Sequence, residues 1–249
     1  MKHKIQYTLL CKSVPEFDKR DGKLYTCSLG YCPEFGLIRV YPLPIVGMKK
    51  WHTYEIEVEK NKRDSRGESW KLSSYSRNEN WIGFTDDCKL VGMANKAKVV
   101  SYLLSCVSPS ISRLNEQRKS IGVVLSQTIN PFWEANDRFI NTRQIGMFDD
   151  VEIADFTKFT KETREKEARV IFKDGDGAHN LQLNEWQFFE FQRKFGATKD
   201  AFRFIKPDQP QLLLMGNMLQ YQNVWMVLSI FESPKSVIQS TVNNLILTH

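Results

Sequence analysis

The stretch from residue 36 to residue 69 constrains the fold of this chain more than any other part of the sequence. Apolar and polar residues alternate along Thr53–Lys60, so that the apolar ones share one face of an extended strand. A preceding strand over Leu37–Tyr41 stops at Pro42, because proline has no N–H to donate to a sheet. The stretch therefore predicts two strands with one face turned toward a hydrophobic core.

Three glutamates, Glu55, Glu57 and Glu59, form the polar face of the second strand. We interpret them as the solvated face of a sheet. A nuclease centre would require an acidic residue two places before a strand lysine, and Lys60 has Val58 at that place. A metal-dependent nuclease that uses these acids is kept only as an alternative function.

The loop and tail beside these strands combine cations with aromatic side chains. Barrels of the oligonucleotide-binding (OB) type hold nucleic-acid strands through cations that follow the phosphates and aromatics that stack on the bases. For the aromatics, the alternative is packing in the core or at its rim. The candidate nucleic-acid-binding residues are Arg39, Tyr41, Lys49, Lys50, Trp51, Lys60, Lys62, Arg63 and Arg66.

Two acidic residues interrupt the basic tail. Asp64 and Glu68 flank Arg66, and balanced charges at a bend more often fix a loop than bind a phosphate. We therefore interpret Asp64 and Glu68 as a structural brace.

The remaining pattern predicts a β-rich N-terminal unit over residues 1–128. Helix signals occur at 95–106 and after Ser110, which is placed to cap a second helix. The long stretch 128–150 is interpreted mostly as a connection. Further strands are expected over 5–11, 23–29, 70–72 and 121–126, with a short apolar segment at 81–84.

A second β-rich unit is expected over residues 129–249. Its clearest element is a helix over Leu183–Phe195, which Asn184 is placed to cap and Gly196 to end. Asp174–Gly177 is interpreted as a hairpin turn, because it lacks the third acid and the final glutamate of a calcium loop. Strands are expected over 151–156, 168–173, 211–215 and 224–231, and the segment 233–249 has mixed signals.

Charge and cysteine content narrow the class of protein. The formal net charge of +6 and the pI of about 9.0 favour contact with a polyanion. The five cysteines are an odd set without zinc-site spacing, no signal peptide is recognisable and no apolar run is long enough to cross a bilayer. We expect a reduced cytoplasmic protein that has buried thiols, no metal site and no membrane contact.

The sequence carries no recognisable catalytic motif. Its four histidines stand apart, and it has no phosphate-binding glycine loop, nucleophile elbow or zinc-protease helix. We therefore expect a protein that is not an enzyme and that needs no cofactor.

Several blocks of the sequence together carry a family likeness. They are KSVP at 12–15, LIRVYPLP at 37–44, YEIEVEKNKRDSRGES at 54–69, SISRLNEQRKSIGVV at 110–124, and LLLMGNM with VWMVLSIF near the C-terminus. With these blocks the chain resembles the uncharacterised prokaryotic proteins described as dual OB-fold (dual OB-containing domain) proteins. The resemblance implies an α+β chain of two small, mainly antiparallel OB-like barrels with helical additions.

The same resemblance implies nucleic-acid contact through one barrel and a role beside mobile elements or in antiviral defence. Relatives often carry cysteines in the segment that corresponds to Lys173–Asn180, whereas this chain has only His179 there, so a zinc knuckle is not expected. We expect a non-catalytic nucleic-acid-binding module, for DNA or RNA, within a larger protein complex. The alternative is a protein-interaction adaptor that binds through the 183–195 helix or a strand edge.

Overall fold

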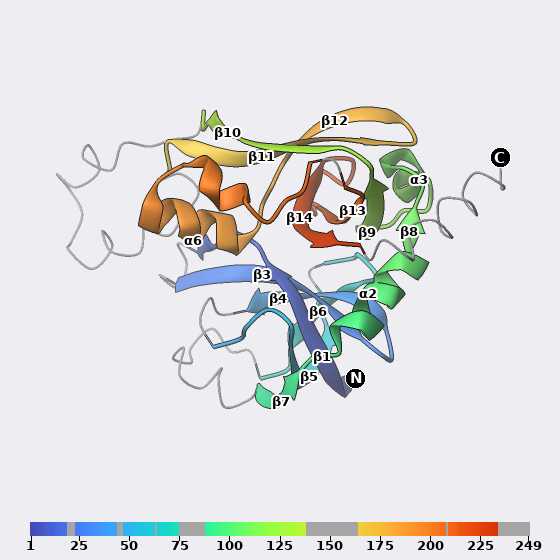
Figure 1. The fold of residues 1–249 in the computed structure, drawn as a ribbon. Coiled ribbons are helices and arrows are strands. Elements are labelled where there is room, and N and C mark those ends of the chain that lie inside the picture. The colour runs from blue at the N-terminus through green and yellow to red at the C-terminus, as the bar shows by residue number, and fades with distance from the viewer. Residues whose placement is uncertain are drawn as a thin grey trace. The chain divides into compact units, whose positions relative to one another are not determined.

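The computed structural model describes residues 1–18, 23–43, 47–62, 64–74, 88–137, 164–207 and 209–233 (Figure 1). By its contacts the chain divides into two units, each made of several segments. Unit 1 comprises Met1–Ala94, Trp133–Glu167 and Glu185–Glu190, and unit 2 comprises Asn95–Phe132, Ala168–Asn184 and Phe191–His249. This division differs from the expected boundary at residue 128.

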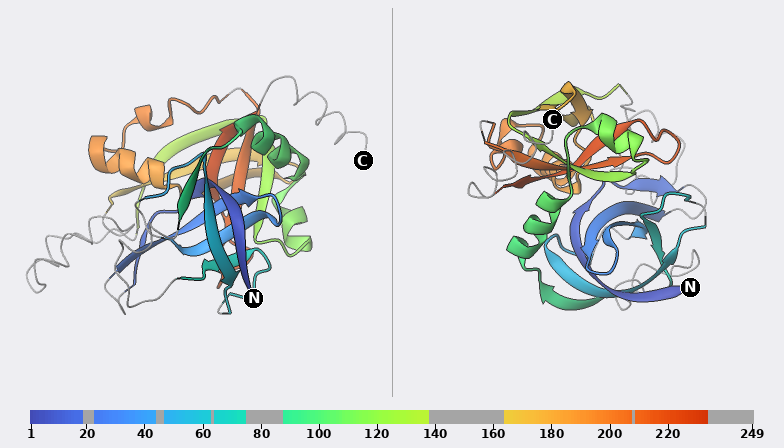
Figure 2. Two further views of the ribbon diagram at one scale, coloured as in Figure 1. Left: turned by 90° about the horizontal axis from the view of Figure 1, so that it is seen from below. Right: turned by 90° about the vertical axis from the view of Figure 1, so that its right-hand side faces the viewer.

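Five strands of unit 1 form a closed barrel. They are β1 (Lys2–Lys12), β3 (Lys23–Cys32), β4 (Gly36–Leu43), β5 (His52–Lys60) and β6 (Ser69–Leu72). They pair in the order β1-β3-β4-β6-β5, and a pairing between β1 and β5 closes the ring, which the right-hand view of Figure 2 shows. All junctions are antiparallel except that of β4 with β6. Two further strands join this sheet, with β2 (Glu16–Asp18) on β3 and β7 (Lys89–Met93) on β5.

The alternation in the sequence fills the interior of this barrel. Tyr54, Ile56 and Val58 of β5 are buried in one apolar cluster with residues of all the other barrel strands. Each fully buried side chain of this size contributes roughly 1.5–3 kcal/mol. The packing is close: a Cβ on Gly30 would lie 2.3 Å from the ring of Tyr7, so only glycine fits there.

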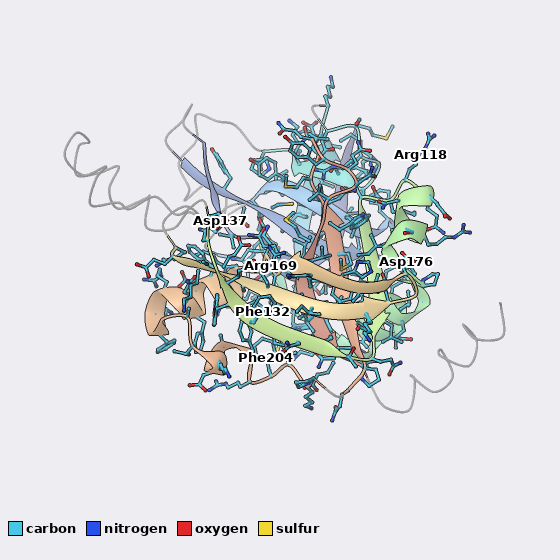
Figure 3. All side chains as sticks on the ribbon, turned by 90° about the horizontal axis from the view of Figure 1, so that it is seen from above. Arg118, Phe132, Asp137, Arg169, Asp176 and Phe204 are labelled. Atoms are coloured by element: carbon cyan, nitrogen blue, oxygen red, sulfur yellow. The ribbon has the colours of Figure 1, made fainter. Side chains whose placement is uncertain are left out.

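The remaining described strands form two other sheets. The sheet of unit 2 has four strands in the order β14 (Trp225–Glu232), β13 (Gln211–Asn217), β9 (Ile121–Ser126) and β8 (Val107–Ser108). Three strands, β10 (Ile129–Ala135), β11 (Lys166–Asp174) and β12 (Gly177–Gln182), form the sheet onto which Figure 3 looks, with Phe132 labelled on β10 and Arg169 on β11. Within the described residues, the structure thus shows one closed barrel.

The helices begin and end at polar residues and glycine. Asn95 caps α2 (Lys96–Ser105) by accepting from the Lys98 N–H at 3.1 Å, and Ser110 caps α3 (Ile111–Glu116) in the same way. Helix α6 (Trp186–Phe195) ends at Gly196, whose φ of 78° is the left-handed value expected of a C-terminal glycine. A short 3-10 helix follows at Lys199–Phe202.

Several predictions of the sequence are confirmed, and others are corrected. The strands at 5–11, 23–29, 37–41, 53–60, 70–72, 121–126, 168–173, 211–215 and 224–231 are present. Helix α6 begins at Trp186, and the Glu185 carbonyl accepts from the Phe188 and Phe189 N–H groups, so Glu185 and not Asn184 occupies the N-cap position. The segment after residue 128, which was expected to be mostly a connection, contains β10. This strand can include Pro131 because it lies at the edge of its sheet.

Strand β9 was expected in the first unit, but it pairs with β13 in unit 2. The segments at 81–84, 151–156 and 234–249 lie outside the described residues. None of the helices in the described ranges is both long and apolar enough to span a bilayer.

We expect only two of the five cysteines to react rapidly with Ellman's reagent in the native protein. Cys11, Cys32 and Cys88 are buried, whereas the other two are half-buried. Burial raises the pKa of the Cys11 thiol well above its usual value and that of Cys32 to about 11, which keeps both protonated and unreactive. The number of thiols that react rapidly is measured in buffer, and the total number is measured in guanidinium. Rapid reaction of three or more thiols in buffer would contradict this burial.

Candidate functional site

The predicted binding residues separate along strand β5. Lys49, Lys50 and Trp51 precede its first residue, whereas Lys60 and Lys62 stand at and beyond its last. A nine-residue strand spans roughly 26 Å at ~3.3 Å per residue, so the two groups lie at opposite ends of the barrel. The sequence grouped them because they are close along the chain.

The group before β5 is largely engaged in internal contacts. The Lys50 ammonium lies 2.5 Å from the carboxylate of Glu185, whose side chain is 3% exposed. Trp51 is half-buried, and its backbone, with φ of 63°, donates to the Leu9 carbonyl at 2.8 Å and accepts from the Ala94 N–H at 2.9 Å. Lys49 is exposed. This end of the barrel therefore offers Lys49 to solvent, while Lys50 balances a buried acid.

The other end of β5 gathers aromatic rings as well as cations. The Lys60 ammonium lies 3.8 Å from the centroid of the Trp70 ring and donates to the Gly67 carbonyl. Phe35 stacks on Trp70 with 4.7 Å between ring centroids and an interplanar angle of 25°. His3 meets both rings edge-on at 5.4 Å. We call His3, Phe35, Lys60, Trp70 and the exposed Lys62 the basic-aromatic end.

Three members of this group were not predicted from the sequence: His3, Phe35 and Trp70. They come from the first strand, the β3–β4 turn and the start of β6. Pairing of His3 with Val58 and the parallel alignment of β4 with β6 bring them together. No local pattern signals this meeting, because it depends on how the ring closes.

A buried ion pair fixes the loop between β5 and β6. The Asp64 carboxylate accepts from the Arg66 guanidinium at 2.6 and 2.8 Å and from the Ser69 hydroxyl at 2.6 Å. The side chains of Asp64 and Arg66 are 7% and 10% exposed. Burial raises the pKa of the Asp64 carboxyl, whereas the Ser69 hydrogen bond and the charge of Arg39 lower it. The pair holds the loop in shape, and Arg66 is directed inward.

Arg39 is joined to this loop rather than presented on the surface. Arg39 is only 3% exposed, and its backbone N–H donates to the backbone carbonyl of Glu68 at 2.9 Å. Leu29, its partner on β3, is also buried, and Tyr41 is half-buried. The outer face of β3 and β4 is therefore largely covered at these positions. Arg63 lies outside the described residues.

The glutamates of β5 are paired with lysines on neighbouring strands. Glu55 contacts Lys4 at 2.9 Å, Glu57 contacts Lys2 at 3.1 Å and Glu59 contacts Lys71 at 2.6 Å. The pKa of each carboxyl is lowered, chiefly by hydrogen bonds from Lys4 to Glu55, from Ser73 to Glu57 and from Lys71 to Glu59. The row is a solvated, charge-balanced sheet face.

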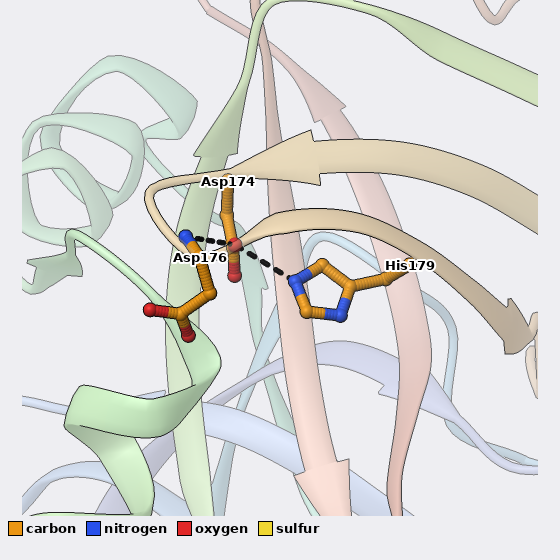
Figure 4. A group of neighbouring side chains, drawn as sticks. All are labelled: Asp174, Asp176 and His179. Carbon is orange, nitrogen blue, oxygen red and sulfur yellow. Dashed lines mark hydrogen bonds and ion pairs between the residues drawn. The ribbon is translucent and has the colours of Figure 1, made fainter.

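The hairpin turn between β11 and β12 brings Asp174, Asp176 and His179 together (Figure 4). The Asp174 carboxylate accepts from His179 Nε2 at 2.7 Å, from the Asp176 N–H at 2.8 Å and from the Ile111 N–H at 3.0 Å.

Asp176 adds a further anchor by accepting from the Ser112 N–H at 2.9 Å, and this backbone hydrogen bond lowers the pKa of the Asp176 carboxyl. The turn thus satisfies two N–H groups at the start of α3, which have no partner within the helix. We therefore interpret Asp174, Asp176 and His179 as a structural clamp that fastens the hairpin turn to the start of α3.

Residues 3–88 match the family model described as Domain of unknown function (DUF8758). The match covers 86 of the 249 residues and takes in the strands from β1 to β6. A search among curated proteins gave no match. The barrel is thus similar to a family of domains whose description states no function.

Proposed function

We propose that this protein is a nucleic-acid-binding module and that it binds through the basic-aromatic end of an OB-like barrel. One observation carries the proposal. In the ring order β1-β3-β4-β6-β5, residues 61–68 connect the fourth and fifth barrel strands. In OB folds this connection is one of the loops that contact oligonucleotides.

The chemistry of the loop fits a phosphate backbone. Lys60 and Lys62 are exposed at its start, and Asp64 with Arg66 keeps the rest of the loop in one shape. A loop that is ordered before binding loses less conformational entropy when the ligand binds. The net charge of +6 has the sign that a polyanion requires.

The covered outer face of β3 and β4 supports binding at the loop between β5 and β6 rather than on the face of these strands. Arg39 and Leu29 are buried there, so a ligand has little access to that face at those positions. The proposal therefore concerns Lys60, Lys62 and the rings beside them, and it leaves Arg39, Lys50 and Arg66 in structural roles.

We expect the purified protein to bind an oligonucleotide with an affinity that falls as salt rises. Fluorescence polarisation with labelled 12-nucleotide single strands and 12-base-pair duplexes of DNA and RNA, at 50 to 300 mM salt, measures this. Each phosphate contact contributes a log–log slope of about −0.7 on single strands and about −0.9 on a duplex. Absence of binding to all four probes at 50 mM salt would refute the proposal.

A further inference from the structure

Phe35 is the exposed member of the stacked rings at the basic-aromatic end. It stands at the tip of the β3–β4 hairpin, immediately before Gly36, whose φ is 74°. Phe35 is 39% exposed, whereas Trp70, on which it stacks, is 5% exposed. Single exposed apolar residues are common on proteins, so the ring stack, and not exposure alone, distinguishes Phe35.

The surroundings of Phe35 hold its ring in place. Trp70 stacks on it, and His3 packs edge-on at an interplanar angle of 88°. In the same hairpin turn, the Cys32 thiol donates to the Glu34 carboxylate at 2.8 Å. A ring that is already positioned gives up little freedom when a ligand stacks on it.

One of the cations that a nucleic-acid ligand needs lies over Trp70, the ring on which Phe35 stacks. Lys60 sits 3.8 Å from the Trp70 centroid, and Lys62 follows two residues later on the surface. A planar platform next to cations is the combination with which proteins hold single strands: bases stack on the ring while phosphates contact the lysines. Bases inside a duplex are stacked on one another, so their faces are not available to such a platform.

We infer that Phe35 is a stacking platform for an unpaired base, so that the ligand of the basic-aromatic end is a single strand or an unpaired end of DNA or RNA. This inference rests on the proposed function. It adds that the ligand is unpaired, and it names Phe35 as the residue that contacts the unpaired base.

The test is the affinity of Phe35 variants for single strands and for a blunt duplex. Phe35→Ala and Phe35→Leu are expected to weaken binding to 12-nucleotide dT and U probes roughly 5- to 150-fold. Phe35→Tyr retains the platform and is expected to bind like the natural chain. The leucine variant keeps an apolar side chain against Trp70, so it tests the loss of the aromatic face even where the alanine variant folds poorly.

A matched control is Phe204→Ala. Phe204 is 41% exposed and belongs to unit 2, and this change is expected to leave the affinity unaltered. Comparison of dT with U probes shows whether the platform prefers DNA or RNA.

The outcomes distinguish failure of this inference from failure of the proposed function. If Phe35→Leu binds single strands as tightly as the natural chain while replacement of Lys60 and Lys62 by glutamine weakens binding, the platform is wrong and the function stands. If the natural chain binds none of the probes, both fail. Equal loss of duplex and single-strand binding in Phe35→Leu would also overturn the inference, because it would show no preference for unpaired bases.

Discussion

Replacement of Lys60 and Lys62 by glutamine is expected to weaken single-strand binding about 60-fold at 50 mM salt. Each phosphate contact contributes a log–log salt slope of about 0.7, so two contacts contribute about 1.4, which amounts to roughly 60-fold between 1 M and 50 mM salt. The difference between variant and natural chain is expected to disappear near 1 M salt. Polarisation titrations at four salt concentrations measure the slope directly.

A matched control for this variant is Lys96→Gln/Lys98→Gln. Both lysines are exposed on helix α2 of unit 2, and the change in net charge is the same. If the two double variants bind with the same slope, the effect comes from overall charge and not from the basic-aromatic end. Circular dichroism of both proteins confirms that the barrel is intact, since Lys60 also packs on Trp70.

The second large effect concerns stability. Asp64→Ala is expected to lower the free energy of unfolding by about 3–5 kcal/mol, because it leaves a buried cation without its partner. Arg66 would lose three hydrogen bonds to the carboxylate, and the Ser69 hydroxyl would lose its acceptor. Urea unfolding followed by tryptophan fluorescence measures the change.

An exposed ion pair provides the comparison. Arg113 and Glu116 lie 2.7 Å apart with side chains 55% and 62% exposed, and Glu116→Ala is expected to cost under about 1 kcal/mol. Adding Arg66→Met to Asp64→Ala is expected to recover part of the loss, since the unpaired charge is removed. Equal costs for Asp64→Ala and Glu116→Ala would mean that the loop does not depend on the brace.

The sequence predicted the parts of the fold that are decided locally. The alternation along β5 is a property of neighbouring residues, so Tyr54, Ile56 and Val58 could be assigned to the core before the barrel was known. The cap at Ser110 was predictable for the same reason.

Contacts between distant residues were not predictable in this way. Lys50 looked like a surface cation, yet its partner Glu185 is 135 residues away. Arg39 lies on the face of β4 opposite the core residues, but the alternation in the sequence does not reveal what covers that face. The meeting of Phe35 with Trp70 depends on the parallel pairing of β4 with β6, for which a single sequence gives no signal.

That parallel pairing is also the place where the β3–β4 and β5–β6 hairpins of the barrel meet. Only two residue pairs join β4 to β6, whereas every other junction of the ring has three or more. This junction has the shortest paired register of the ring, and Phe35 and Lys60 belong to the hairpins on its two sides. A ligand strand that contacts both hairpins would join them across this junction, so that binding would stabilise the closed barrel by mass action.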